Sequence, residues 1–333
     1  MSADTLCMQN PQQLDMAAID AAVTEGRQVI VQFDTLGEPA PLIADLDAAA
    51  KRHGTALTVR IYGYESRVFD AAIVRALPHV ASLALDFHRR AVNLEALGEL
   101  TRLKQLSLGV YELAQHDILA LENLRQLEVL SLGEAAHDKL DLSPLRHYSK
   151  LASLTIDGHS HHLDTLAQLP ALQTLSLFRI KNKVALDFLG SVAQLRELRL
   201  QLGGRESIAA IEAPLLHKLE LIRVRGLAQL GPLQRFPLLR HLWVEDQTQL
   251  DQLDLSGNSA LETLHLLTCK SLASLTSLAA LPALQKLSIS ETALEPDALL
   301  AQALPASLRE MRFRTGKAKR DREISTQLAA LGL

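Results

Sequence analysis

The sequence is poor in cysteine and in aromatic residues. Cys7 and Cys269 are its only cysteines in 333 residues, too few for a disulfide framework, and aromatic residues make up 4% with a single Trp. It has no apolar run of 18 residues and no basic segment followed by an apolar leader at its N-terminus. These absences predict a protein of the reducing cytoplasm without a membrane span; export independent of a signal peptide stays open.

Charge of one sign is also missing. Lys and Arg total 34 against 38 for Asp and Glu, so the net charge is −4 and nucleic acid is not an expected partner. Hydrophobic residues reach 48% and charged residues 22%, which excludes disorder. Leucine alone supplies 70 residues. The richness in Ala and Leu favours a bacterial source.

The leucines follow a repeat of the form apolar-x-x-apolar-x-apolar. The intervals between copies average about 22.9 residues, and all 36 residues at positions 1, 4 and 6 of twelve copies are apolar. Ten clear copies and two degenerate ones begin at Ala56, Val80, Leu103, Leu127, Leu151, Leu172, Leu195, Leu216, Leu239, Leu261, Leu284 and Leu308.

This pattern resembles the leucine-rich repeat family, and its short units resemble those of internalins. The resemblance implies an α/β solenoid, with a curved parallel β-sheet on the concave face and short 3₁₀ or helical segments on the convex face. The family usually has Asn or Cys at position 9, where the side chain satisfies buried backbone groups. Only Cys269 fits among the residues at that position, so we expect irregular turns with different hydrogen bonds.

The segments between strands are expected to be short. Leucine recurs at every third residue in 163–172 and 272–284, a spacing typical of 3₁₀ turns. The stretch 250–258 imitates a full repeat but lies only 11 residues from both neighbours, which places it on the convex side. We expect a true helix within 66–77.

The ends differ from the repeats. Residues 15–26 and 40–54 are helical in pattern, and 28–33 and 59–63 are strands, so a βαβ unit is expected to start the sheet. At the other end, 323–331 is an amphipathic helix with Ile324, Leu328 and Leu331 on one side. The predicted organisation is an α/β cap over 1–55, about twelve repeats over 56–316 and a helical cap over 317–333.

Motifs of enzymes are missing, since no phosphate-binding loop, GxSxG, HExxH or CxxC occurs. Asp157, His159, His161 and His162 form the one segment that resembles a metal site, with a solvated turn as the alternative. His265 and Cys269 are a weaker pair of the same kind. A basic run at the C-terminal end fits an acidic partner or nucleic acid, with a solvated cap as the alternative; it consists of Arg309, Arg312, Arg314, Lys317, Lys319, Arg320 and Arg322.

The concave face is the candidate binding site. Positions 3, 5 and 7 of each strand point away from the core. Apart from Phe178, the residues at positions 5 and 7 are small or bland in the copies that start at Leu103 to Leu172, and from the copy at Leu195 onward large and charged residues appear at these positions. Trp243 lies among them, and Trp and Arg contribute much of the energy of interfaces; cross-strand packing of Trp243 is the alternative. The predicted partner-binding residues are Phe178, Arg199, Gln201, Glu220, Ile222, Trp243, Glu245, His265 and Leu267.

The sequence thus predicts a non-catalytic module that binds a protein partner on its concave face, such as an inhibitor, an immunity-type protein or an effector. It implies no cofactor, and we expect a monomer. A metal- or ligand-binding protein that uses the histidine segment 157–162 is the second hypothesis, and self-association through exposed edges is the third.

Overall fold

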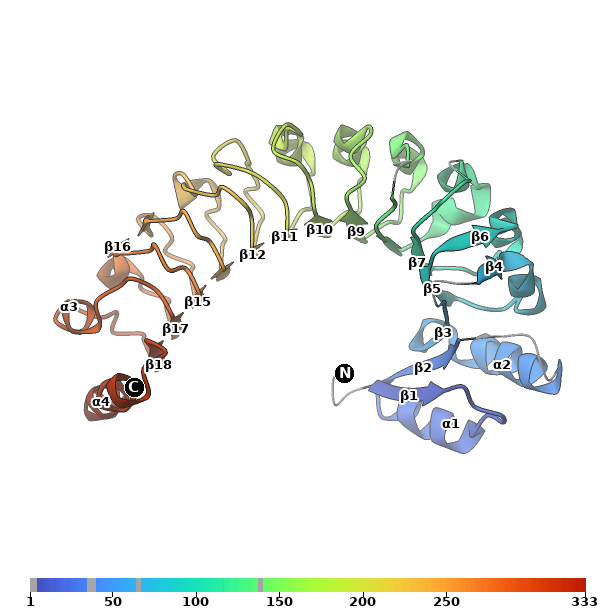
Figure 1. Cartoon of the computed structure of the whole chain (residues 1–333), viewed down its shortest axis with the longest axis horizontal. Coiled ribbons are helices and arrows are strands. Elements are labelled where there is room, and N and C mark those ends of the chain that lie inside the picture. The colour runs from blue at the N-terminus through green and yellow to red at the C-terminus, as the bar shows by residue number, and fades with distance from the viewer. Residues whose placement is uncertain (1–4, 35–39, 64–66, 116, 137–139) are drawn as a thin grey trace. The chain divides into compact units, whose positions relative to one another are not determined.

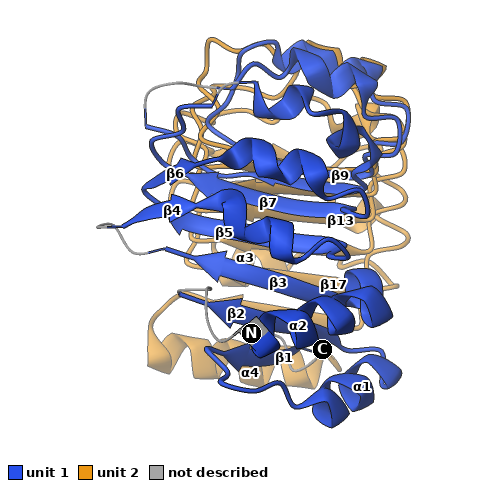
Figure 2. Cartoon of the chain, turned by 90° about the vertical axis from the view of Figure 1, so that its right-hand side faces the viewer, with its two compact units in different colours: residues 1–172 blue, residues 173–333 orange. Residues whose placement is uncertain are grey.

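The computed structural model describes residues 5–34, 40–63, 67–115, 117–136 and 140–333. The chain divides into two compact units, residues 1–172 (unit 1) and 173–333 (unit 2), coloured separately in Figure 2. In each unit the strands line one side and the short helical segments line the other (Figure 1).

Both units are parallel sheets whose strands come from successive repeats. In unit 1 the order is β1 (Thr5–Gln9), β2 (Gln28–Phe33), β3 (Leu57–Tyr62), β5 (Ser82–His88), β7 (Gln105–Val110), β8 (Val129–Leu132) and β9 (Ser153–Asp157). In unit 2 it is β10 (Thr174–Phe178), β11 (Glu197–Gln201), β12 (Lys218–Ile222), β13 (His241–Glu245), β15 (Thr263–Leu267), β17 (Lys286–Ser290) and β18 (Glu310–Arg314). The predicted leucine-rich repeat architecture is confirmed.

The repeated apolar residues form the core. At positions 1, 4 and 6 of the twelve copies every side chain is buried except that of Ala56, which is half-buried. Full burial of a leucine contributes about 1.5–3 kcal/mol. Each repeat buries its leucines against the repeats on either side. The fold is therefore stabilised by the stacking of repeats, since no single repeat could bury its own leucines.

Most return segments contain 3₁₀ helices, as the leucine spacing predicts. They are η1 (Gly54–Ala56), η2 (Ala71–Ala76), η3 (Leu94–Glu99), η4 (Ile118–Ala120), η5 (Glu122–Gln126), η6 (Ser143–His147), η7 (Leu163–Gln168), η8 (Asp187–Ser191), η9 (Leu233–Arg235) and η10 (Leu278–Ala280), with one short α-helix, α3 (Pro296–Leu300). The α-helix expected within 66–77 is wrong, because that segment forms a short strand followed by η2.

Short parallel ladders also run between return segments. β4 (Val68–Asp70) pairs with β6 (Arg90–Val92), and β14 (Gln252–Asp254) pairs with β16 (Ser274–Thr276). Figure 1 shows β4, β6 and β16 on the side away from the main strands of their units. The stretch 250–258 therefore lies on the convex side, as predicted.

The helices and strands expected at the two ends of the chain are present, but some details differ from the prediction. Helices α1 (Met16–Thr24), α2 (Ala40–His53) and α4 (Ala318–Ala330) are present, and Asp15 caps α1 by accepting a hydrogen bond from the Ala18 backbone N–H at 2.9 Å. The sheet begins one strand earlier than predicted, because β1 pairs in parallel with β2. On α4 Ile324 and Leu328 are buried, but Leu331 is exposed, so its predicted inward position is wrong. Among the described residues, no helix is both long and apolar enough to cross a lipid bilayer.

A left-handed residue follows many of the strands, at position 8 of the repeat. This conformation is sterically unfavourable for residues with a side chain. Its non-glycine examples have φ between 48° and 58° and are Phe87, Arg179, Leu202, Arg223, Asp246, Thr268 and Glu291. The turn sends the next side chain, at position 9, toward the core.

Several position-9 side chains then form hydrogen bonds with backbone groups of the neighbouring repeat. His88 Nε2 donates to Ile61 O at 3.0 Å, and Gln247 Nε2 donates to Leu221 O at 3.1 Å. His159 accepts from the Leu140 N–H through Nδ1 at 3.0 Å, and the Cys269 thiol lies 3.7 Å from Val244 O. The expected different hydrogen bonds are present, because imidazole and amide groups here take the role that Asn or Cys has in the family.

Candidate functional site

The nine predicted binding residues lie on the outer face of the unit 2 sheet, which is the face that points away from the core. Along each strand they alternate with buried leucine or valine residues, so the predicted register is correct. Pairing sets them in two rows across neighbouring strands. One row is Arg199, Glu220, Trp243 and His265, and the other is Phe178, Gln201, Ile222, Glu245 and Leu267.

A compact charge cluster occupies one end of the first row. Arg199 Nε forms a short ion pair with Glu220 Oε2, and Lys218 Nζ lies 3.1 Å from Glu220 Oε1. These neighbours cover Glu220, which is only 9% exposed. Burial acts to raise the pKa of Glu220, but hydrogen bonds from Arg199 and Lys218 outweigh it and lower the pKa. Glu220 therefore acts as the anionic centre that orients two cationic side chains.

Trp243 is half-buried at the centre of the row. Its Nε1 donates to Glu245 Oε2 at 2.8 Å, and its ring centroid lies 4.5 Å from that of His265. Burial, followed by the charge of His241, lowers the pKa of His265. Trp243 thus does pack across strands, as the alternative interpretation held. These contacts fix its ring, so the surface it presents to solvent is already ordered.

An exposed aromatic cluster in unit 1 was not predicted. Phe87 is 75% exposed and Tyr111 is 49% exposed, at the ends of the adjacent strands β5 and β7. The Arg60 guanidinium lies 5.3 Å from the Tyr62 ring centroid and 5.8 Å from that of Phe87. Phe87 occupies position 8, where the left-handed turn directs the side chain outward. Comparing position 8 across repeats was the signal that could have located it.

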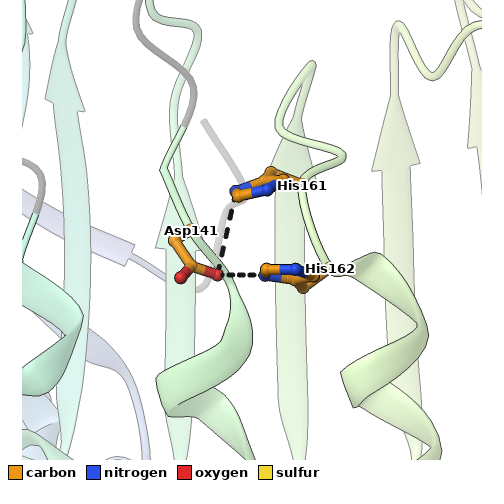
Figure 3. A group of neighbouring side chains, drawn as sticks. All are labelled: Asp141, His161 and His162. Carbon is orange, nitrogen blue, oxygen red and sulfur yellow. Dashed lines mark hydrogen bonds and ion pairs between the residues drawn. The ribbon is translucent and has the colours of Figure 1, made fainter.

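The histidine segment does not form the predicted set of ligands. His159 is buried, and both its nitrogens are engaged, with Nε2 2.9 Å from Gly133 O. The structure instead brings Asp141 beside His161 and His162, with one ligand atom of each within 4.8 Å of the others (Figure 3). Asp141 precedes His162 by 21 residues, about one repeat, so an alignment of return segments could have identified it.

The two remaining candidates are Cys269, from the pair with His265, and the basic run 309–322. Their contacts are those of structural residues. The Cys269 thiol lies within hydrogen-bonding distance of two backbone carbonyls, Val244 O and Leu267 O, and burial raises the pKa of the thiol. In the basic run, Arg320 contacts Asp297 at 2.6 Å and Glu323 at 3.2 Å, and Arg312 contacts Glu310 at 2.8 Å. The acidic neighbours therefore neutralise part of the positive charge at this end of unit 2.

Neither protein-family models nor curated proteins match the chain, whereas solved structures do. An internalin (inlF) from Listeria monocytogenes aligns with a TM-score of 0.60 and 16% identity, covering 93% of this chain and 86% of that chain. The Toll–Spätzle complex of Drosophila gives a TM-score of 0.49 at 13% identity, covering 93% of this chain and 50% of that one. The likeness to the internalin agrees with the geometry above: the chain has the fold of a leucine-rich repeat solenoid.

Proposed function

We propose that the chain is a non-catalytic binding module that holds a partner protein on the outer face of the unit 2 sheet. The observation that carries this proposal is the row formed by Arg199, Glu220, Trp243 and His265, in which an aromatic ring and a charge cluster are fixed side by side on four adjacent strands. Trp and Arg are over-represented among residues whose truncation weakens interfaces by about 2 kcal/mol or more.

Order in the free protein favours binding. Immobilising flexible side chains when a partner binds costs free energy and weakens the affinity. Here Glu245 holds the indole and Glu220 holds Arg199, so much of this ordering already exists in the free chain. An arginine held in an ion pair still offers the remaining N–H groups of its guanidinium to a partner.

The biological role we propose is that of an inhibitor, an immunity-type protein or an effector, acting in the cytoplasm as a monomer. Each of these roles requires a rigid surface that recognises one protein. The face of a repeat sheet suits this need, because neighbouring strands place side chains about 4.8 Å apart in fixed register.

Affinity capture from lysate of the source organism tests the location of the site. The bait proteins are the wild type, Trp243→Ala/Arg199→Ala, Phe87→Ser/Tyr111→Ser, and a control, Gln252→Ala/Ser274→Ala, on the exposed β14–β16 ladder. Circular dichroism first establishes that each variant is folded. We expect one partner to be lost only with Trp243→Ala/Arg199→Ala.

Two results would overturn the proposed location. In the first, the partner is retained by Trp243→Ala/Arg199→Ala but lost with Phe87→Ser/Tyr111→Ser, which would move the interface to the aromatic cluster of unit 1. In the second, all four baits capture the same proteins, which would show that neither surface is specific.

A further inference from the structure

Three return segments contain the same aspartate clamp, in which one Asp joins two successive repeats. In each clamp the Asp accepts a hydrogen bond from the backbone N–H two residues later, and another from the side chain of a left-handed residue in the next repeat. The clamps are Asp70 with Asn93 at 2.8 Å, Asp141 with His162 at 2.7 Å, and Asp254 with Ser277 at 2.8 Å. A hydrogen bond between Asp141 and His162 is thus first of all a structural feature.

The clamp at Asp141 differs from the other two because the imidazole of His161 lies beside it, in addition to that of His162. The residues that precede Asn93 and Ser277 are Val92 and Thr276, whereas His161 precedes His162. His161 Nδ1 lies 3.9 Å from Asp141 Oδ1, the same oxygen that His162 Nδ1 contacts. The two imidazole rings stack with centroids 4.0 Å apart, and both face the carboxylate (Figure 3). In the third clamp Thr276 Oγ1 donates to Asp254 Oδ1 at 3.0 Å, but the clamp at Asp70 forms with the apolar Val92 at this place. The clamp therefore does not require a polar side chain at the position of His161.

We propose that Asp141, His161 and His162 bind a late first-row divalent cation, with Zn²⁺ or Ni²⁺ as the ions that suit the ligands best. Two imidazole nitrogens and one carboxylate oxygen form a donor set that these ions favour. Bonds to such ligands are about 2.0–2.2 Å long, so the ligand atoms around one ion lie about 3–4 Å apart. The distances from Asp141 Oδ1, 2.7 Å to His162 Nδ1 and 3.9 Å to His161 Nδ1, already approach this range.

Access and position support the same assignment. The side chains of His161, His162 and Asp141 are 61%, 52% and 43% exposed, so an ion can enter and water can complete its coordination. The backbone holds the ligands in register, because Asp141 and His161 form a parallel bridge and the Leu142 N–H donates to His161 O at 3.1 Å. The cation replaces the proton shared by His162 Nδ1 and Asp141 Oδ1 and links two repeats of unit 1.

Equilibrium dialysis of the full-length chain without a polyhistidine tag tests the site, with zinc sulfate and nickel chloride as separate probes. We expect one ion per chain for the wild type and a loss of affinity of at least about tenfold in His161→Gln/His162→Asn. Asn at 162 tolerates the left-handed φ of 57°. His147→Gln, which changes an exposed histidine of η6 outside the cluster, is the matched control and should bind like the wild type.

The single variant His161→Gln separates a metal site from the clamp. It leaves the hydrogen bond between Asp141 and His162 in place, so we expect an unchanged melting temperature without metal. The rise in melting temperature that zinc produces in the wild type should be reduced in this variant. Equal binding by wild type and double variant, unchanged affinity in His161→Gln, or no binding up to about 1 mM free ion would each overturn the proposal. These outcomes do not involve Trp243 and leave the proposed protein-binding function unaffected.

Discussion

At position 8 of the repeat, side chains stand in a backbone conformation that disfavours them. Leu202 has φ of 57° and is 37% exposed, so its side chain is only partly buried. A left-handed conformation costs about 1–2 kcal/mol for a residue with a Cβ atom, least for Asn and most for β-branched residues. The repeat therefore accepts local strain in order to turn position 9 inward.

Substitution of Leu202 measures this strain. We expect Leu202→Asn to leave the free energy of unfolding unchanged or to raise it, and Leu202→Val to lower it by roughly 1 kcal/mol or more. Urea denaturation provides the measurement. A Leu202→Val variant as stable as Leu202→Asn would show that the left-handed turn is not strained.

Gln247 provides the corresponding test at position 9. Its buried Nε2 donates to Leu221 O at 3.1 Å and to Glu245 O at 2.8 Å. Gln247→Leu should lower the free energy of unfolding by about 1–3 kcal/mol, because buried carbonyls lose their donor. Gln249→Leu, at an exposed position two residues later, is the control and should change stability little. Equal effects of the two substitutions would contradict the role of position 9.

At the scale of elements, His88 joins β5 to β3 and makes this contact sensitive to acid. Its Nε2 donates to Ile61 O, and its ring stacks on Phe69 with centroids 4.2 Å apart. Burial lowers the pKa of His88 below its ordinary value of 6.5, despite the opposing hydrogen bond to Ile61. A lowered folded-state pKa means that the stabilisation is complete above pH 6.5 and is lost as the pH falls toward the folded-state value.

His88→Asn should remove this dependence while keeping an amide donor. We expect wild type to lose up to about 1.4 kcal/mol more unfolding free energy than His88→Asn when the pH drops from about 7.5 to about 5.5, because about one pH unit of this range lies below the ordinary histidine pKa of 6.5. Denaturant titrations of both proteins at the two pH values give this difference in unfolding free energy. Other titrating groups contribute equally to both proteins, so their effects cancel. Parallel losses would show that His88 does not titrate within this range.

Strands and 3₁₀ segments were predictable because their signals are local. Leu106 and Leu108 show the two-residue period of a strand, and Leu163, Leu166 and Leu169 show the three-residue spacing of a 3₁₀ turn. Contacts between repeats were harder to predict. The pairing of Asp141 with His162 depends on the register of two return segments, and the donors at position 9 are chemically varied, so a search for Asn or Cys overlooked them.

At the scale of the whole molecule, the repeat sets where recognition can occur. Every strand places positions 4 and 6 in the core, so variation is confined to the outer sheet face and the return segments. In unit 2 this face carries the row around Trp243, and in unit 1 the return segments carry Asp141, His161 and His162. A function in protein binding and a site for a cation can therefore coexist without competing for the same residues.

The single Trp of the chain allows the central claim to be tested at one atom. With 5-fluorotryptophan in place of Trp243, the protein gives one fluorine resonance from the middle of the proposed interface. We predict that adding the captured partner shifts or broadens this resonance in proportion to the bound fraction, because the half-exposed indole becomes covered. A partner that binds by calorimetry while the resonance stays unchanged would contradict the account and place the interface elsewhere.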